Sequence, residues 1–146
     1  MEKQVIQSVG FRNIVSDGKV TGFQLKIRLP YYRGVFLSQI KVGPLVVDGE
    51  TIPKDRIMWR VGNTDYTWQE MLASRNTHWH PLELATLIVD KPGGLAQGYH
   101  DLKYSYACTH SYMPPGLEAL MDPNKDEIVY LTEFGHMHNS RRLLIV

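Results

Sequence analysis

Two histidines separated by one residue, His78 and His80, form the pattern in this sequence with the most direct chemical meaning. Residues two apart on a β-strand point to the same face, so both imidazoles could reach one metal ion. Glu83 follows closely and offers a carboxylate as a third ligand. The alternative is that both histidines lie in a loop or at a strand end and bind backbone or water. One hypothesis is therefore a metalloenzyme.

The spacing of His78, His80 and Glu83 resembles the metal-binding motif of the cupins, which are β-sandwich metalloproteins, but the match is incomplete. Leu72 and Asp90 stand where that motif has glycine, and Glu83 comes one residue too early. Pro81 interrupts the run that should carry the ligands, and Gln97 stands where the second cupin motif needs a histidine. A cupin-like metalloenzyme that uses His78, His80 and Glu83 is therefore kept only as an alternative.

Other reactive patterns are weaker. The single cysteine, Cys108, falls on an apolar strand face, where a thiol is usually an inert small hydrophobic group. His136 and His138 repeat the histidine spacing with no carboxylate close behind, which predicts a polar strand edge. There is no nucleophile elbow, phosphate-binding loop or dinucleotide fingerprint, and residues 93–98 are interpreted as a turn or mobile loop. The sequence therefore does not assemble an active site of its own.

The elements that must position these residues are predicted to be strands. The chain has 146 residues, of which 43% are hydrophobic and 21% charged, with a net charge of +1, which predicts one globular domain over residues 1–146. No basic cluster, no apolar run of membrane-spanning length and no secretory signal occur, so we expect no nucleic-acid or membrane partner and a cytoplasmic location. Turn signals at short intervals favour an antiparallel, jelly-roll-like β-sandwich with one or two short helices at most.

Individual elements follow from local patterns. Phe23, Leu25 and Ile27 alternate with polar residues, which predicts a half-buried strand over residues 20–29. Asp17-Gly18 should join it to a strand at 10–15, and Asp48-Gly49 should form a second hairpin. Thr67 and Glu70 have the spacing of a helix capping box. The remaining predicted strands span residues 57–61, 82–89, 99–112, 128–134 and 143–146, with a loop or short helix at 117–126.

The strand predicted at residues 99–112 has one aromatic face, which includes Tyr104, Tyr106, His110 and Tyr112. A face of this kind covers a core or lines a cleft, because such an area is costly to leave in water. A carbohydrate-binding sandwich that uses this face as a sugar platform is a third hypothesis.

Several unusual strings occur together and in order. They are the run GFQLKIRLPYYRG at residues 22–34 followed by Leu37-Ser38, the turn Val47-Asp48-Gly49-Glu50, the segment Lys91-Pro92-Gly93-Gly94-Leu95 with Gly98 and His100, and Ser111-Tyr112-Met113-Pro114. Through these strings, about residues 10–114 resemble the small (β) subunit of bacterial C-glycoside deglycosidases.

The resemblance implies a β-sandwich that is one subunit of a hetero-oligomeric lyase and is inactive alone. The large α subunit of such enzymes is similar to xylose-isomerase-type TIM barrels, and it carries the general base and a divalent metal, Mn²⁺ or a similar ion. The substrate is a C-glycoside already oxidised at the sugar 3-position. Its C–C glycosidic bond is cleaved by β-elimination to give the aglycone and an unsaturated keto sugar. No catalytic residue, metal ligand or bound cofactor is then expected on this chain.

On this interpretation the chain covers the pocket of the large subunit and helps to shape its aglycone side. The residues that we expect to contact the substrate or the partner are Tyr31, Tyr32, Arg33, His100, His110, Tyr112 and Met113. Tyrosine and arginine are enriched where one protein surface meets another, which agrees with this choice.

Overall fold

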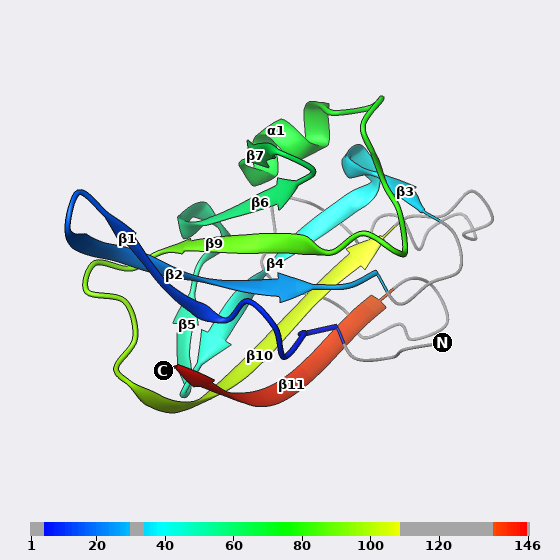
Figure 1. Ribbon diagram of the computed structural model, residues 1–146. Helices are drawn as coiled ribbons and strands as arrows, with labels where there is room; N and C mark the ends of the chain where they lie inside the picture. The colour runs from blue at the N-terminus through cyan, green and yellow to red at the C-terminus, as the bar shows by residue number, and fades with distance from the viewer. Residues whose placement is uncertain (1–4, 30–33, 109–135, 146) are drawn as a thin grey trace.

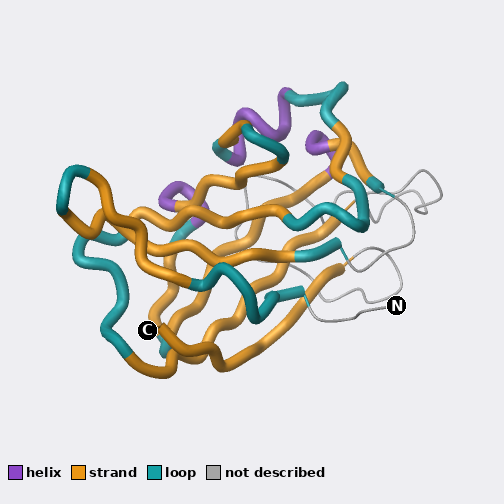
Figure 2. The backbone as a smooth tube through the Cα atoms, in the orientation of Figure 1, coloured by secondary structure: helices purple, strands orange, loops and turns teal. Residues whose placement is uncertain are grey.

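The computed structural model describes residues 5–29, 34–108 and 136–145 of the chain. It is an all-β sandwich in which two antiparallel sheets lie face to face (Figures 1 and 2). The predicted antiparallel β-sandwich with little helix is therefore confirmed.

Within the described residues, the first sheet has five strands. The alternation of apolar and polar residues along a strand determines which side chains face the core. Phe23, Leu25 and Ile27 are fully buried, as the period-two pattern predicted. The strand predicted at residues 82–89 is present as β9 (Ala85–Asp90) and lies at the centre of the sheet, with strands on both sides. In spatial order the strands are β1 (Arg12–Ser16), β2 (Lys19–Ile27), β9 (Ala85–Asp90), β6 (Ile57–Val61) and β7 (Thr64–Tyr66).

The start of β9 was predicted wrongly, at residue 82. Leu82 is 92% exposed and lies before β9, which begins at Ala85. The backbone N–H of Glu83 donates to the carbonyl of His80 at 3.0 Å, so residues 80–83 form a turn. The apolar character of Leu82 is therefore not a sign of a buried strand.

In the part of the chain that the structure describes, the second sheet has four strands and is built around the longest of them, β10. Leu102, Tyr104, Tyr106 and Cys108 face the core and are buried, which confirms the predicted aromatic face as far as Cys108. The predicted segments at 117–126 and 128–134 lie outside the described residues. The strand predicted at 143–146 begins earlier than predicted, at His136. In spatial order the strands are β11 (His136–Ile145), β10 (Gly98–Cys108), β4 (Ile40–Val47) and β5 (Glu50–Ile52).

Aromatic side chains from both sheets meet in the core. The ring of Trp59 contacts Tyr106 edge-on with centroids 5.3 Å apart, and it contacts Trp79 in the same way at 5.4 Å. Its indole N–H donates to the Tyr104 hydroxyl at 3.2 Å, so the buried polar atoms are paired. Each large side chain buried in this way contributes about 1.5–3 kcal/mol to stability.

One corner of the sandwich is joined by side chains rather than by a strand. Residues 5–7 extend along the end of β2, with Gln7 N–H donating to the Lys26 carbonyl at 2.9 Å. The other backbone edge of this segment faces β11, where Ile6 N–H donates to Asn139 Oδ1 at 2.8 Å. Arg141 Nη1 donates to the Ile6 carbonyl at the same distance. Side chains of β11 therefore tie the two sheets together.

The helical content of the described residues is small, as predicted. Helix α1 (Trp68–Ala73) begins after Thr67, whose hydroxyl accepts from Glu70 N–H at 3.2 Å while Glu70 accepts from Thr67 N–H at 3.0 Å. The predicted capping box is therefore present. Two short 3₁₀ turns span Leu37–Gln39 and Lys54–Arg56. Within the described ranges, no helix is long and apolar enough to cross a membrane.

Candidate functional site

A small two-stranded sheet, β3 (Val35–Phe36) paired with β8 (His78–Trp79), lies at one end of the sandwich. We call the part of the molecule around it the β3–β8 end. Gly34 is packed so tightly there that an added Cβ would lie 2.6 Å from the Trp79 carbonyl oxygen and would also overlap the His78 ring. Only glycine fits this position. The rings of Phe36 and His78 also contact each other edge to face, with centroids 5.1 Å apart.

The two histidines of the metal hypothesis do come together, but the predicted third ligand does not join them. His78 Nδ1 lies 3.4 Å from His80 Nε2. The Glu83 carboxylate instead accepts from the backbone N–H of Gly62 at 2.9 Å. No three His, Cys, Asp or Glu side chains among the described residues are grouped so that they could hold a metal ion. The structure therefore does not assemble the predicted His–His–Glu site.

Two core residues next to the β3–β8 end, Tyr106 and Cys108, are fully buried and chemically inert. The Tyr106 hydroxyl donates to the Arg28 carbonyl at 2.7 Å, and burial holds the pKa of this phenol well above its usual value. Burial likewise raises the pKa of the Cys108 thiol. A thiol reacts as the thiolate, so Cys108 is a neutral core residue at physiological pH, as its position on an apolar face predicted.

The buried aromatic face corrects the sugar-platform hypothesis for the described part of β10. Tyr104 and Tyr106 are both 0% exposed and contact the Trp59 ring. A sugar therefore cannot stack on either ring. Their area is used to cover the core, which was the other interpretation of an aromatic strand face.

Six of the seven predicted contact residues lie outside the described residues, namely Tyr31, Tyr32, Arg33, His110, Tyr112 and Met113. The described residues next to them converge on one place. The backbone carbonyl of Arg28 accepts a hydrogen bond from the Tyr106 hydroxyl, and Gly34 packs against Trp79. The ring centroids of Trp79 and Tyr106 lie 5.8 Å apart, so these contacts are neighbours. The β3–β8 end is therefore the candidate functional site, and the roles of the six residues stay predictions.

His100 lies elsewhere, near the start of β10. Eight residues of extended strand, about 26 Å, separate it from Cys108. Its Nδ1 lies 2.6 Å from the Asp48 carboxylate, and its Nε2 lies 2.7 Å from the Ala96 carbonyl. The His100 side chain is only 11% exposed. We call His100, Asp48 and Ala96 together the His100 clasp.

Electrostatics within the His100 clasp favour the charged pair. Burial alone would lower the pKa of His100, but the Ala96 carbonyl and the Asp48 carboxylate together raise it above its ordinary value. The hydrogen bond from His100 lowers the pKa of Asp48, and a second bond, from Asp101 N–H at 2.8 Å, acts in the same direction. These contacts hold the loop at Ala96 against the β4–β5 turn, so they fit a structural role.

Sequence reasoning missed the partners that make this clasp. Asp48 was singled out only as a turn residue, and its φ of 50° confirms that turn. A second missed contact fixes the same loop, because the Asn13 side chain accepts from Leu95 N–H at 2.9 Å and donates to the Leu95 carbonyl at 2.8 Å. The loop before β10 is therefore held at Leu95 by the Asn13 side chain of β1 and at Ala96 by the His100 side chain of β10.

Comparison with known proteins agrees with the resemblance found in the sequence. The family model for the C-glycoside deglycosidase beta subunit matches residues 1–112. A protein of Eubacterium cellulosolvens named "C-glycoside deglycosidase beta subunit" is 60% identical over 147 residues, covering 100% of both chains. A protein with the same name from Arthrobacter globiformis is 30% identical over 62% of this chain and 66% of its own length. Another, from Microbacterium trichothecenolyticum, is 30% identical over 45% of this chain and 50% of its own length. This chain belongs to the C-glycoside deglycosidase beta subunit family.

Proposed function

We propose that this chain is the small subunit of a hetero-oligomeric lyase that cleaves the C–C glycosidic bond of 3-oxo-C-glycosides. The observation that carries the proposal is the 60% identity, over the full length of both chains, to a protein named as the beta subunit of a C-glycoside deglycosidase. A protein named as a beta subunit belongs to an assembly, so the complete enzyme is expected to contain a second kind of chain.

The proposed reaction is a β-elimination. A ketone at C3 acidifies the C2–H bond, because the carbanion left at C2 is delocalised onto the ketone oxygen. After a base removes this proton, the electron pair forms a double bond between C1 and C2, and the bond from C1 to the aglycone carbon breaks. The aglycone carbon leaves with the bonding electrons and takes up a proton. The products are the aglycone and an unsaturated keto sugar.

The proposal assigns the base and the divalent metal, manganese or a similar ion, to a large subunit similar to xylose-isomerase-type TIM barrels. The described residues of this chain do not fit a metal, because the Glu83 carboxylate binds Gly62 and leaves His78 and His80 without a third ligand. Where it is bound, such an ion would supply positive charge that stabilises an enolate oxygen.

This chain would then cover the pocket of the large subunit and shape its aglycone side. The residues proposed for that role are Tyr31, Tyr32, Arg33, His110, Tyr112 and Met113, and what supports the choice is that their described neighbours meet at the β3–β8 end. His100 was predicted to share the role, but both of its ring nitrogens are already bonded within this chain.

The test is reconstitution with the cognate large subunit. Each chain is purified alone and also after co-expression, and release of aglycone from a 3-oxo-C-glucoside is followed by chromatography. We expect turnover only by the complex, with no more than background from this chain alone. Turnover by the isolated chain at the rate of the complex would overturn the proposal, as would a complex that fails to form.

A further inference from the structure

We infer that the large subunit docks on the outer face of β10 and β11; the inference rests on the proposed function and says where the proposed partner binds. The β10–β11 face is formed by side chains that point away from the core, and the sheet register puts them in three neighbouring cross-strand pairs: Tyr99 with Leu144, Asp101 with Arg142, and Lys103 with Ser140.

The first pair is hydrophobic and exposed. Tyr99 is 69% exposed and Leu144 is 44% exposed, although they lie directly opposite each other on paired strands. Two adjacent apolar side chains on a sheet face are costly to leave in water, and tyrosine is enriched at the centres of protein interfaces. These two residues therefore offer a hydrophobic anchor for a partner.

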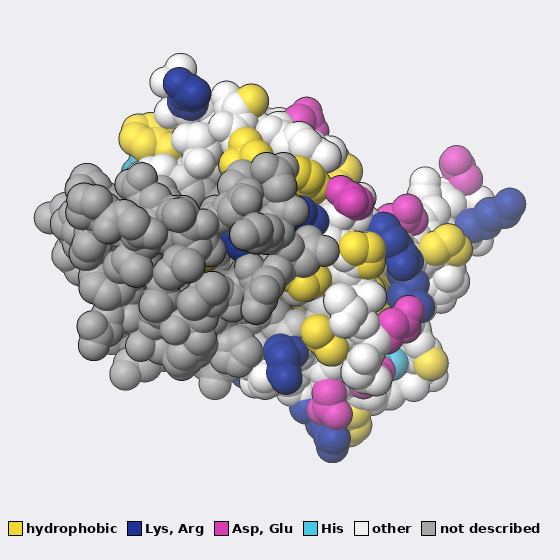
Figure 3. Space-filling view, turned by 180° about the vertical axis from the view of Figure 1, so that it is seen from behind, with side chains coloured by type: hydrophobic (Ala, Val, Ile, Leu, Met, Phe, Trp, Pro, Cys, Tyr) yellow, Lys and Arg dark blue, Asp and Glu magenta, His cyan; other side chains and the backbone are white. Residues whose placement is uncertain are grey.

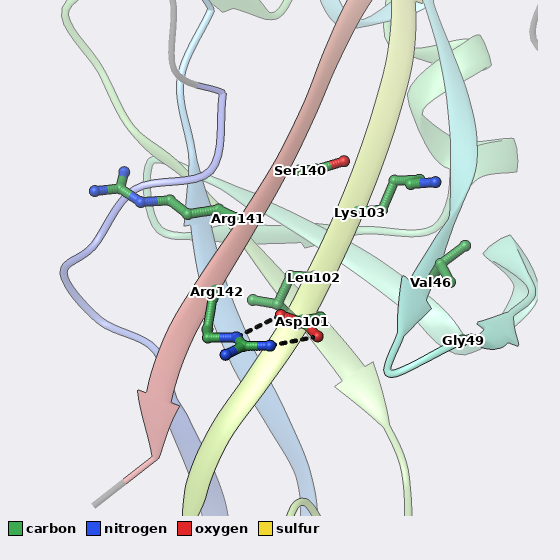
Figure 4. Close-up of a pocket in the computed structure, with 8 residues that line it drawn as sticks. All are labelled: Val46, Gly49, Asp101, Leu102, Lys103, Ser140, Arg141 and Arg142. Carbon is green, nitrogen blue, oxygen red and sulfur yellow. Dashed lines mark hydrogen bonds and ion pairs between the residues drawn. The ribbon is translucent and has the colours of Figure 1, made fainter.

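A shallow hollow of about 420 Å³ lies beside this anchor (Figure 4). Its walls include Val46 of β4, Leu102 and Lys103 of β10, and Arg142 of β11. In the view from behind (Figure 3), hydrophobic side chains lie among both Lys/Arg and Asp/Glu side chains beside the grey residues. A hollow whose walls combine apolar and charged side chains can receive a projecting side chain of a partner.

Charge on the face selects the kind of partner. The Asp101 carboxylate accepts two bonds from the Arg142 guanidinium, at 2.8 and 3.2 Å, so both ions are already neutralised (Figure 4). Lys103 is exposed and forms no ion pair with any described residue. Among its described side chains, the face therefore has one uncompensated cation. The matching partner surface carries a carboxylate opposite Lys103 and apolar side chains opposite Tyr99 and Leu144.

A second copy of this chain would match this face poorly. The described carboxylate on the face, Asp101, is bonded to Arg142, so a copy that packed face to face would offer Lys103 no uncommitted acid from the described part of that face. The nearest acid on the adjoining turn, Asp48, is bonded to His100. A different protein chain with its own acidic group is therefore the occupant that this charge pattern fits.

The experiment measures binding of this chain to the immobilised large subunit at low and high salt. The test variants are Tyr99→Ser and Lys103→Glu, whose side chains are exposed, so folding should be preserved. The matched controls are Val15→Ser and Lys19→Glu on the first sheet, where Val15 is 65% exposed and Lys19 is also exposed. Melting curves of all four variants verify that each is folded.

We expect each test variant to weaken binding by about tenfold or more and the controls to stay within about twofold of the native chain. Lys103→Glu should also reduce the salt dependence of binding, because it removes the charge attraction. If the native chain does not remain soluble alone, the same variants are co-expressed, and the salt concentration that separates the subunits is compared.

The outcomes separate this inference from the proposed function. If the native complex forms and is active but both test variants bind as the controls do, the docking face is wrong and the proposed function stands. If the isolated chain forms a dimer that Tyr99→Ser abolishes, the face belongs to a second copy and the inference is overturned. If the native chain neither binds the large subunit nor supports activity, the proposed function fails, and the inference fails with it.

Discussion

His100 lies between two groups that can only accept a hydrogen bond, the Asp48 carboxylate and the Ala96 carbonyl. A neutral imidazole has one N–H and could satisfy only one of them. Both contacts therefore require the doubly protonated ring, which agrees with the raised pKa of His100. At the scale of single residues, this is the part of the described structure whose contacts depend most directly on pH.

The first prediction is that the His100 clasp stabilises the fold at acidic to neutral pH and loses strength as the pH rises. The pKa of His100 is raised above its ordinary value of 6.5, so its contribution is fully present below pH 6.5 and is lost as the pH rises through the higher folded value. The pKa of Asp48 is lowered from 3.8, so its contribution is present above that pH and is lost as the pH falls through the lower folded value.

The measurement is urea unfolding of the native chain and of His100→Gln across pH 5 to 9. We expect the difference in unfolding free energy between the two to be largest at the acidic end of this range and to shrink as the pH rises. Asp48→Asn serves as the control that keeps the histidine but removes its charged partner, and it should reduce the pH dependence. A difference that is constant across the range would contradict the charged clasp.

A second prediction at the residue scale concerns Gly34. Alanine at this position would place a methyl group against the Trp79 carbonyl oxygen, which is backbone and cannot turn aside. We expect Gly34→Ala to lower the unfolding free energy by about 1–3 kcal/mol. Gly18→Ala is the comparison, since an added Cβ there meets no atom within 4 Å and its cost comes only from the positive φ. Equal melting temperatures for Gly34→Ala and the native chain would show that the packing at the β3–β8 end is loose.

At the scale of elements, the corner between β2 and β11 makes the third prediction. Asn139→Ala would leave the backbone N–H of Ile6 without its acceptor, and Ile6 is fully buried. Removal of one partner of a buried pair costs about 1–3 kcal/mol. Ser140→Ala, at the next position but exposed, should change the unfolding free energy by no more than about 0.5 kcal/mol. Urea unfolding of both variants makes the comparison, and equal stabilities would mean that the corner contributes nothing.

The elements that could be predicted are those whose sequence signal lies within a few neighbouring residues. The alternation of β2, the turn at Asp48-Gly49 and the capping box at Thr67 each depend on residues a few positions apart, and all three are present. The corner could not be predicted, because Ile6 and Asn139 are 133 positions apart in the sequence. A hydrogen bond between such residues leaves no periodic signal, and neither does the pair of His100 with Asp48.

The candidate site shows the same division. The spacing of His78 and His80 correctly predicted that the two imidazoles lie together, but the position of Glu83 in the sequence did not reveal that its carboxylate binds Gly62. The family, in contrast, could be recognised because it depends on strings of residues rather than on contacts. The family model that matches residues 1–112 confirms that recognition.

At the scale of the whole molecule, the single cysteine makes the fourth prediction. Cys108 is fully buried, and burial raises its pKa, so both access and thiolate formation require the sandwich to open. A thiol reagent such as DTNB should therefore react slowly with the folded chain and at once in denaturant. The reaction should be faster for Gly34→Ala than for the native chain if the two differ in stability. Immediate, stoichiometric labelling of the native chain would contradict the buried position.

The bonds from Asn139 and Arg141 to Ile6 have a consequence for biosynthesis. Ile6 leaves the ribosome well before β11, yet the groups that complete its hydrogen bonds belong to that later strand. Contacts between such distant residues form late in folding, so the nascent sandwich keeps an open seam until β11 has emerged. A polypeptide that stops before β11 would expose the hydrophobic interior along that seam and would be prone to aggregate or to be degraded.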